Sequence, residues 1–354
     1  MKKYHGIQIL RFLAAALVVV EHLTGNVLGH WSKSYHSMVP AFGEIGVVVF
    51  FGISGFIMIT TQYESFGNAS NSANFFVRRL LRVLPIYAIA TTLQFINKFN
   101  FSADYTFLNY IKSLLFIPYL DAHGLFRPVL AQGWTLNYEM FFYLVFAISL
   151  AFNRVKGLLL GMAVFVALAA SHEAASKVNV FFEFYSSQML VFFVCGMLIG
   201  IVKKKTSWSS EVLAFPILCW LILIPASLLL EPYMDPVYWF GLNLCMVSIC
   251  VFSAASYQAP HYGKGILFFE LLGDISYSTY LFHGFVLGAS KFLSNRVADG
   301  EVGKLIALNI FCIVTANVAG LVVYTFIEKP IARSLKNVGK QSQRLVERPK
   351  STPI

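Results

Sequence analysis

The stretch Ile7–Leu28, IQILRFLAAALVVVEHLTGNVL, decides what kind of fold this chain can adopt. It is apolar and long enough to cross a bilayer as a helix, yet it contains Arg11, Glu21 and His22. A charged side chain near the bilayer centre costs about 2.5–3.5 kcal/mol on insertion scales, so ionisable groups in such a helix point to a function. The stretch therefore predicts a membrane helix that takes part in chemistry.

Arg11 and His22 project from the same face of this predicted helix. Their spacing amounts to three turns plus about 20°, and it separates them by about 16 Å along the axis. We expect the helix to line one groove, with an anion-binding mouth at Arg11 and a reactive His22 deep among the helices. The alternative is that Arg11 snorkels to the headgroups and His22 only hydrogen-bonds a neighbouring helix.

The composition is that of a polytopic membrane protein. The chain has 354 residues, of which 57% are hydrophobic and 12% charged, and its mean hydropathy is +0.67. The net charge of +10 comes from basic residues between apolar runs, which indicates membrane topology and anionic lipid and excludes nucleic acid as a partner. The five cysteines lie inside apolar runs without CxxC spacing, so we expect neither a disulfide framework nor a metal site.

Apolar runs predict an all-α bundle of about ten transmembrane helices, near 6–28, 41–61, 80–97, 133–152, 155–171, 184–202, 212–230, 237–255, 266–287 and 303–327. An even number places both termini on one side. Most of the 27 lysines and arginines fall in the segments on that side, which predicts cytoplasmic termini. The shorter run 107–120 contains Lys112 and Pro118, and we interpret it as an interfacial or re-entrant segment of an outer loop.

The chain is expected to form one membrane domain over residues 1–330. Residues 331–354 are basic and contain few apolar side chains, which predicts a disordered cytoplasmic tail that contacts anionic lipid.

Ionisable residues in the predicted outer half form a candidate acid/base cluster. Glu139 lies about 10 Å below the outer boundary of its run, close to the level of His22. His283 belongs to the same half, at the end of a helical stripe made of Gly273, Ser276, Tyr280 and His283. Three such groups at one depth predict a catalytic cluster of His22, Glu139 and His283. The alternative is that the helix bundle satisfies each of them separately.

The predicted inner half is basic instead. Four arginines in this half suit bidentate contacts with phosphate groups, namely Arg11, Arg78, Arg79 and Arg82. The alternative is that the positive-inside rule alone accounts for arginines on the cytoplasmic side. The glycines of the segment Phe50–Phe56 predict close helix packing and room for a thin ligand arm.

Six motifs in order resemble the acyltransferase-3 family of bacterial inner-membrane proteins, and most closely its exopolysaccharide O-acetyltransferases. They are Arg11 with His22, Phe50–Phe56, Arg78-Arg79-Leu80-Leu81-Arg82 before Pro85, Trp134-Thr135-Leu136 with Glu139, Gly273–Ser278 with Tyr280 and His283, and Glu328-Lys329-Pro330. Close relatives are expected to have an acid where this chain has Val48, so any role of that acid is absent here.

The resemblance implies an enzyme that moves an acyl group, usually acetyl, from cytoplasmic acyl-CoA to a hydroxyl of a surface polysaccharide or its lipid-linked precursor. The arginine group would then bind acyl-CoA, and Trp134, Ser276 and Tyr280 would contact the acceptor. We expect neutral His22 to take the proton from the acceptor hydroxyl, with an acyl-histidine intermediate left open as an alternative. Polar groups at matched depth also fit a transporter or flippase for a lipid-linked sugar, and a structural or sensor protein is a third class.

Overall fold

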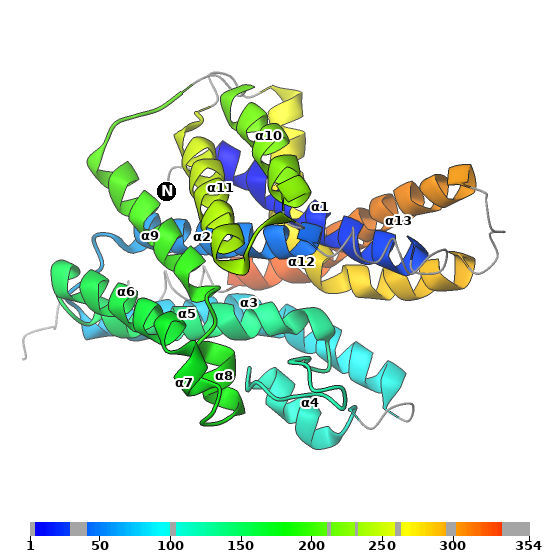
Figure 1. Cartoon of the computed structure of the whole chain (residues 1–354), viewed down its shortest axis with the longest axis horizontal. Coiled ribbons are helices and arrows are strands. Elements are labelled where there is room, and N and C mark those ends of the chain that lie inside the picture. The colour runs from blue at the N-terminus through cyan, green and yellow to red at the C-terminus, as the bar shows by residue number, and fades with distance from the viewer. Residues whose placement is uncertain are drawn as a thin grey trace, which may run out of the picture.

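The computed structural model describes residues 4–28, 41–99, 104–210, 214–230, 233–258, 263–294 and 302–334. Within these ranges the chain forms helices and loops and no strand (Figure 1). The long helices are α1 (His5–Leu28), α2 (Ala41–Gln62), α3 (Ala69–Lys98), α5 (Trp134–Leu150), α6 (Arg154–Ala170), α9 (Leu190–Lys205), α10 (Ala214–Leu230), α11 (Pro236–Ser256), α12 (Lys264–Ser294) and α13 (Val302–Val323). The short ones are α4 (Phe107–Leu114), α7 (His172–Ala175) and α8 (Val180–Tyr185), with a 3-10 turn at Ala131–Gly133 and a π turn at Tyr324–Glu328.

Every apolar run predicted to span the membrane coincides with one of the long helices. By length and composition, six helical segments of the described chain can cross a bilayer, namely 5–23, 43–62, 69–98, 180–205, 236–256 and 306–334. Helices α5, α6 and α10 are apolar but contain 17 residues each, close to the shortest length that spans. The all-helical prediction is thus confirmed, while ten crossings and cytoplasmic termini stay predictions.

Helix α3 begins eleven residues before the predicted run because its start is fixed by a polar cap. The side chain of Asn68 accepts a hydrogen bond from the backbone N–H of Ser70, 2.8 Å away. The first turns are polar and exposed, so hydropathy could not reveal them. The segment 107–120 contains only the eight-residue helix α4, which at about 12 Å is too short to cross a bilayer.

Glycines let the central helices pack at very short range. Gly52 and Gly55 of α2 face Gly196 and the backbone of Phe193 in α9, and a Cβ atom on either Gly55 or Gly196 would collide with backbone of the opposite helix. Around this crossing, the rings of Phe142 and Phe193 stack 4.3 Å apart. Helix α1 packs against α2, α11 and α12.

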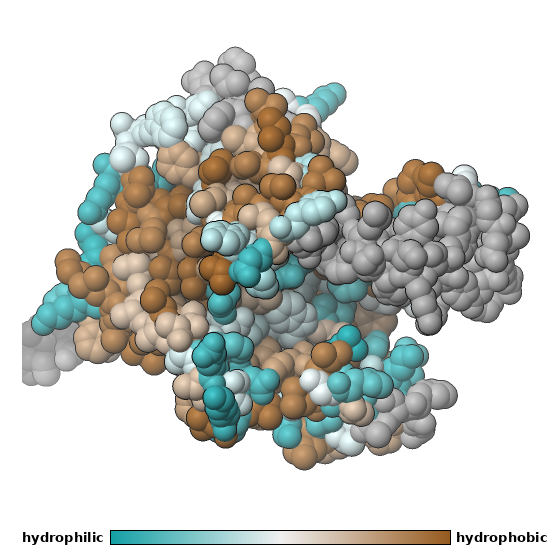
Figure 2. Space-filling view, viewed as in Figure 1, coloured by the Kyte–Doolittle hydropathy of each residue, from teal (hydrophilic) through white to brown (hydrophobic). Residues whose placement is uncertain are grey.

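Three connections predicted to lie on one side of the membrane do meet at one end of the bundle. Arg154 at the start of α6 pairs with Glu64 and covers the ring of Tyr63, 4.3 Å from its centroid. Lys204 at the end of α9 reaches the same ring, 6.0 Å from the centroid. Apolar side chains cover α9, α10 and α11 in Figure 2, whereas polar ones gather around α7, α8 and α4.

The predicted tail lies almost wholly outside the described residues, which end at residue 334. The π turn before it is buried at Glu328, whose carboxylate accepts a hydrogen bond from Ser278 of α12 at 2.7 Å.

Candidate active site

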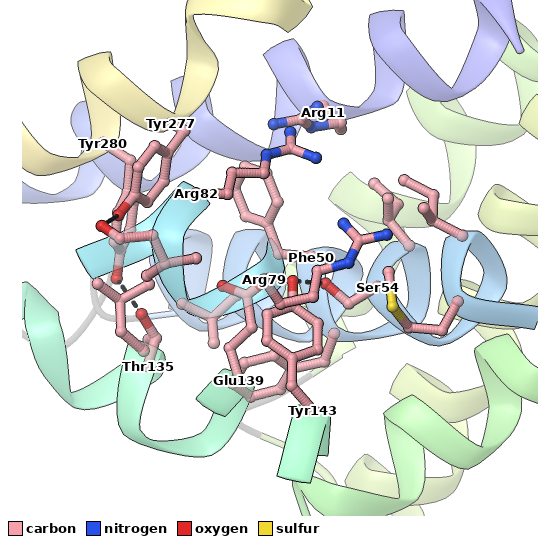
Figure 3. A pocket seen from close by; sticks show the side chains of 17 residues that line it. Arg11, Phe50, Ser54, Arg79, Arg82, Thr135, Glu139, Tyr143, Tyr277 and Tyr280 are labelled. Carbon is pink, nitrogen blue, oxygen red and sulfur yellow. Dashed lines mark hydrogen bonds between the residues drawn. The ribbon is translucent and has the colours of Figure 1, made fainter. Parts of the chain in front are cut away.

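An arginine cavity of about 100 Å³ lies between α1, α2, α3, α5 and α12. Figure 3 shows the side chains of Arg11, Arg79 and Arg82 around it. Arg79 and Arg82 are three residues apart on α3 and therefore share a helix face, whereas Arg78 does not line the cavity. The Arg79 guanidinium lies 5.6 Å from the ring centroid of Tyr143, which holds it at the cavity wall.

Glu139 lies in this arginine cavity and not beside the histidines. Its carboxylate accepts hydrogen bonds from the hydroxyl of Tyr143 and from Ser54 Oγ, the latter at 3.4 Å. The predicted cluster of His22, Glu139 and His283 is therefore not assembled. The sequence did not reveal that α5 turns this side chain toward the arginines.

The two histidines lie beside each other and line a second, larger space, the imidazole cavity, of about 580 Å³. Their ring centroids are 5.2 Å apart. His22 Nδ1 lies 2.8 Å from the carbonyl oxygen of Val18, and His283 Nδ1 lies 2.6 Å from that of Tyr280. Because a carbonyl only accepts, each Nδ1 carries the proton, and Nε2 of a neutral ring keeps a lone pair that can accept another.

The surroundings of the two rings differ. His283 is buried, whereas His22 is exposed to the open imidazole cavity. The expectation that His22 lies deep among the helices is therefore wrong.

Tyr280 and Val47 separate the two cavities and line both. The Tyr280 hydroxyl donates to the carbonyl of Gln132 at 2.9 Å and lies within hydrogen-bonding distance of Thr135 Oγ1, at 2.8 Å. The ring of Phe50 meets Tyr280 edge-on, with centroids 6.2 Å apart. Arg11 and His22, predicted to lie in a single groove, thus line two cavities that adjoin at Tyr280.

Of the other two residues predicted to contact the acceptor, Trp134 and Ser276, only Trp134 lines one of these two cavities. Trp134 lines the imidazole cavity, while Ser276 is buried and donates its hydroxyl proton to the carbonyl of Gly273 in its own helix. The polar lining residues that sequence reasoning missed include Arg127, Gln132 and Tyr143. Of these, Tyr143 follows Glu139 by four residues, a spacing that predicts their contact on a helix.

The described residues hold no group of three or more His, Cys, Asp and Glu side chains placed to bind a metal ion. The two cavities are lined by the imidazoles of His22 and His283, by several arginines, and by the carboxylates of Glu21, Glu44 and Glu139.

A comparison with known families identifies the chain. The model of the acyltransferase domain of the acyltransferase-3 family matches residues 4–326. The chain belongs to this acyltransferase family. It is similar to the exopolysaccharide production protein ExoZ of Rhizobium meliloti (strain 1021), with 27% identity over 305 residues that cover 82% of this chain and 90% of that protein. No solved structure gives a significant match.

Proposed function

We propose that this membrane acyltransferase moves an acetyl or other short acyl group from cytoplasmic acyl-CoA to a hydroxyl of an exopolysaccharide, an O-antigen or a lipid-linked glycan precursor, in a bacterial inner membrane. The observation that carries the proposal is the His22–His283 pair, with centroids 5.2 Å apart, in a cavity that shares Tyr280 with the arginine cavity. The similarity to a protein of exopolysaccharide production favours a glycan acceptor.

The arginine cavity suits the acyl-CoA donor. Coenzyme A combines phosphate groups with a long, thin thioester arm. Arg11, Arg79 and Arg82 offer guanidinium groups, which bind phosphate oxygens through charge-assisted and often bidentate hydrogen bonds. A space of about 100 Å³ accepts a thin chain but not a sugar ring with its neighbours, so the arm would lie here and point toward Tyr280.

His22 is the group best placed to start the transfer. Its Nε2 takes the proton of the acceptor hydroxyl while that oxygen attacks the thioester carbonyl carbon. The C–S bond then breaks, and the CoA thiolate leaves with the proton that His22 carried. His283 lies against the His22 ring and positions it. Attack by His22 Nε2 itself, through an acyl-histidine, is the second route that the same geometry permits.

Glu139 acts on the donor side in this scheme. Its carboxylate lies among the arginines and is fixed by Tyr143 and Ser54, so it orients guanidinium groups rather than an imidazole. Trp134 lines the imidazole cavity, where the acceptor would bind.

The test is transfer of label from radioactive acetyl-CoA to polysaccharide in membranes that contain or lack this protein. We expect labelled O-acetyl groups, released by mild alkali, only where the protein is present. A flippase or a structural protein would move no label. Unlabelled glycan in the presence of active, correctly inserted protein would contradict the proposal.

A further inference from the structure

The imidazole cavity continues into two further hollows that meet it at Met189. The first, the Trp239 arm, has a volume of about 410 Å³, and its lining includes Glu44, Trp239 and Asn243. The second, the Trp134 arm, has a volume of about 290 Å³, and its lining includes Arg127 and Trp134. Glu44 also lines the imidazole cavity, as do Arg127 and Trp134, and Met189 lines all three spaces. The three spaces therefore adjoin one another in pairs.

From this we infer that the acceptor is an oligosaccharide segment of several sugars, bound with its reacting sugar at His22 and its neighbouring sugars in the two arms. The inference rests on the proposed function and specifies its acceptor. The imidazole cavity, at about 580 Å³, already lies within the range of 300–1,000 Å³ that holds one small ligand. A single sugar bound at His22 would leave both arms empty.

The lining of the Trp239 arm has the mixed chemistry that a sugar requires. A pyranose presents C–H groups on its faces and hydroxyls around its edge, so its site combines aromatic faces with hydrogen-bonding side chains. The rings of Trp239 and Phe240 supply the first, and Glu44, His172 and Gln188 supply the second. A lipid tail would need walls without such polar groups.

One buried polar atom in the same arm has no partner among the described residues. Asn243 is 7% exposed, and its Nδ2 donates to the carbonyl of Trp239 at 3.1 Å. Its Oδ1 accepts no hydrogen bond there. A buried acceptor left unpaired costs free energy, and a sugar hydroxyl in the arm would supply the missing donor.

The experiment measures binding and transfer for acceptors of graded length. The probes are mono-, di- and tetrasaccharide fragments of the host's surface polysaccharide, freed of acyl groups by mild alkali. Dissociation constants are measured by calorimetry on the purified full-length protein, and kcat/KM from labelled acetyl-CoA. We expect the wild type to bind the tetrasaccharide at least about tenfold more tightly than the monosaccharide, which corresponds to about 1.4 kcal/mol.

Variants assign this gain to the Trp239 arm. Trp239→Ala and Asn243→Ala should each remove most of the gain for the tetrasaccharide and leave monosaccharide binding unchanged, while Trp239→Phe keeps an aromatic face and should retain it. Trp208→Ala is the control for an exposed tryptophan outside the arms. Asn317→Ala is the control for an asparagine with the same type of bond to the carbonyl four residues earlier, here at 2.9 Å.

The outcomes separate this inference from the proposed function. Equal affinity for short and long acceptors would overturn the inference even if acetyl transfer occurs. So would Trp239→Ala and Asn243→Ala variants that keep the full gain in affinity for the tetrasaccharide. Binding that depends on acceptor length, without any acetyl transfer, would contradict the proposed function but support an oligosaccharide site in the imidazole cavity and its arms. Tighter binding of free lipid than of the tetrasaccharide to the same arm would also overturn the inference.

Discussion

At the scale of single residues, the arginine motif of α3 offers a test of donor binding in which Arg78 is the control for Arg79 and Arg82. Arg79 and Arg82 line the arginine cavity, whereas Arg78, beside them in sequence, does not. Hydrogen bonds to charged groups contribute about 1.5–3 kcal/mol, so Arg79→Ala and Arg82→Ala should each raise the KM for acetyl-CoA at least about tenfold. Arg78→Ala should stay near the wild-type value. Initial rates at graded acetyl-CoA concentration check this, and an equal effect of all three would indicate only a general surface charge.

Glu139 gives a second prediction at this scale, because its position distinguishes two roles. If it orients the arginines, Glu139→Gln should raise the KM for acetyl-CoA more than it lowers kcat, since the guanidinium groups lose the carboxylate that faces them. Tyr143→Phe removes the hydroxyl that donates to Glu139 and should shift KM in the same direction by a smaller factor. A loss confined to kcat, with KM unchanged, would instead place Glu139 in the acid/base step.

The same residue shows what the sequence could and could not predict about the site. Spacing along one helix put His283 and Tyr280 on a common stripe, and both line the imidazole cavity. Which way α5 turns Glu139 depends on how α5 packs on α2 and α3, and no local pattern encodes that rotation. Met189, where the three spaces adjoin, follows the break between α8 and α9 and likewise had no signal in the sequence.

At the scale of elements, the contact between α2 and α9 leads to a stability prediction. A methyl group at Gly196 would collide with the α2 backbone at Gly52, and a backbone cannot move aside as a flexible side chain can. We expect Gly196→Ala to destabilise the purified protein by about 1–3 kcal/mol, the usual cost of overpacking. Gly241 of α11 has open space around its Cβ position, so Gly241→Ala should leave the melting temperature unchanged or raise it. Equal melting temperatures for the two variants would contradict this packing.

Helix positions were more predictable than helix boundaries. Apolar runs located the long helices because burial in lipid and in the bundle requires apolar side chains over most of their length. The polar start of α3 and the break before α9 depend on capping by Asn68 and on the turn at 186–189, which hydropathy does not register.

At the scale of the whole molecule, the topology is open to direct labelling. In a variant that lacks the native cysteines, His123→Cys should react with a membrane-impermeant maleimide on intact cells, because the outer-loop prediction places it outside. Ser207→Cys, beside the lysines at the end of α9, should react only after the membrane is opened. The reverse pattern would invert the predicted topology, and labelling of both positions on intact cells would rule out the odd number of crossings predicted between them.

The most direct test of the account measures acetyl transfer by purified wild type, His22→Ala and His123→Ala, with labelled acetyl-CoA and the de-acetylated polysaccharide of the host. His123 is an exposed loop residue that lines none of the cavities described, which makes it the matched control. We expect His22→Ala to lower kcat about 100-fold or more, as for the loss of a general base, with the KM for acetyl-CoA little changed and His123→Ala fully active. Full O-acetylation of the polysaccharide by His22→Ala would contradict this expectation.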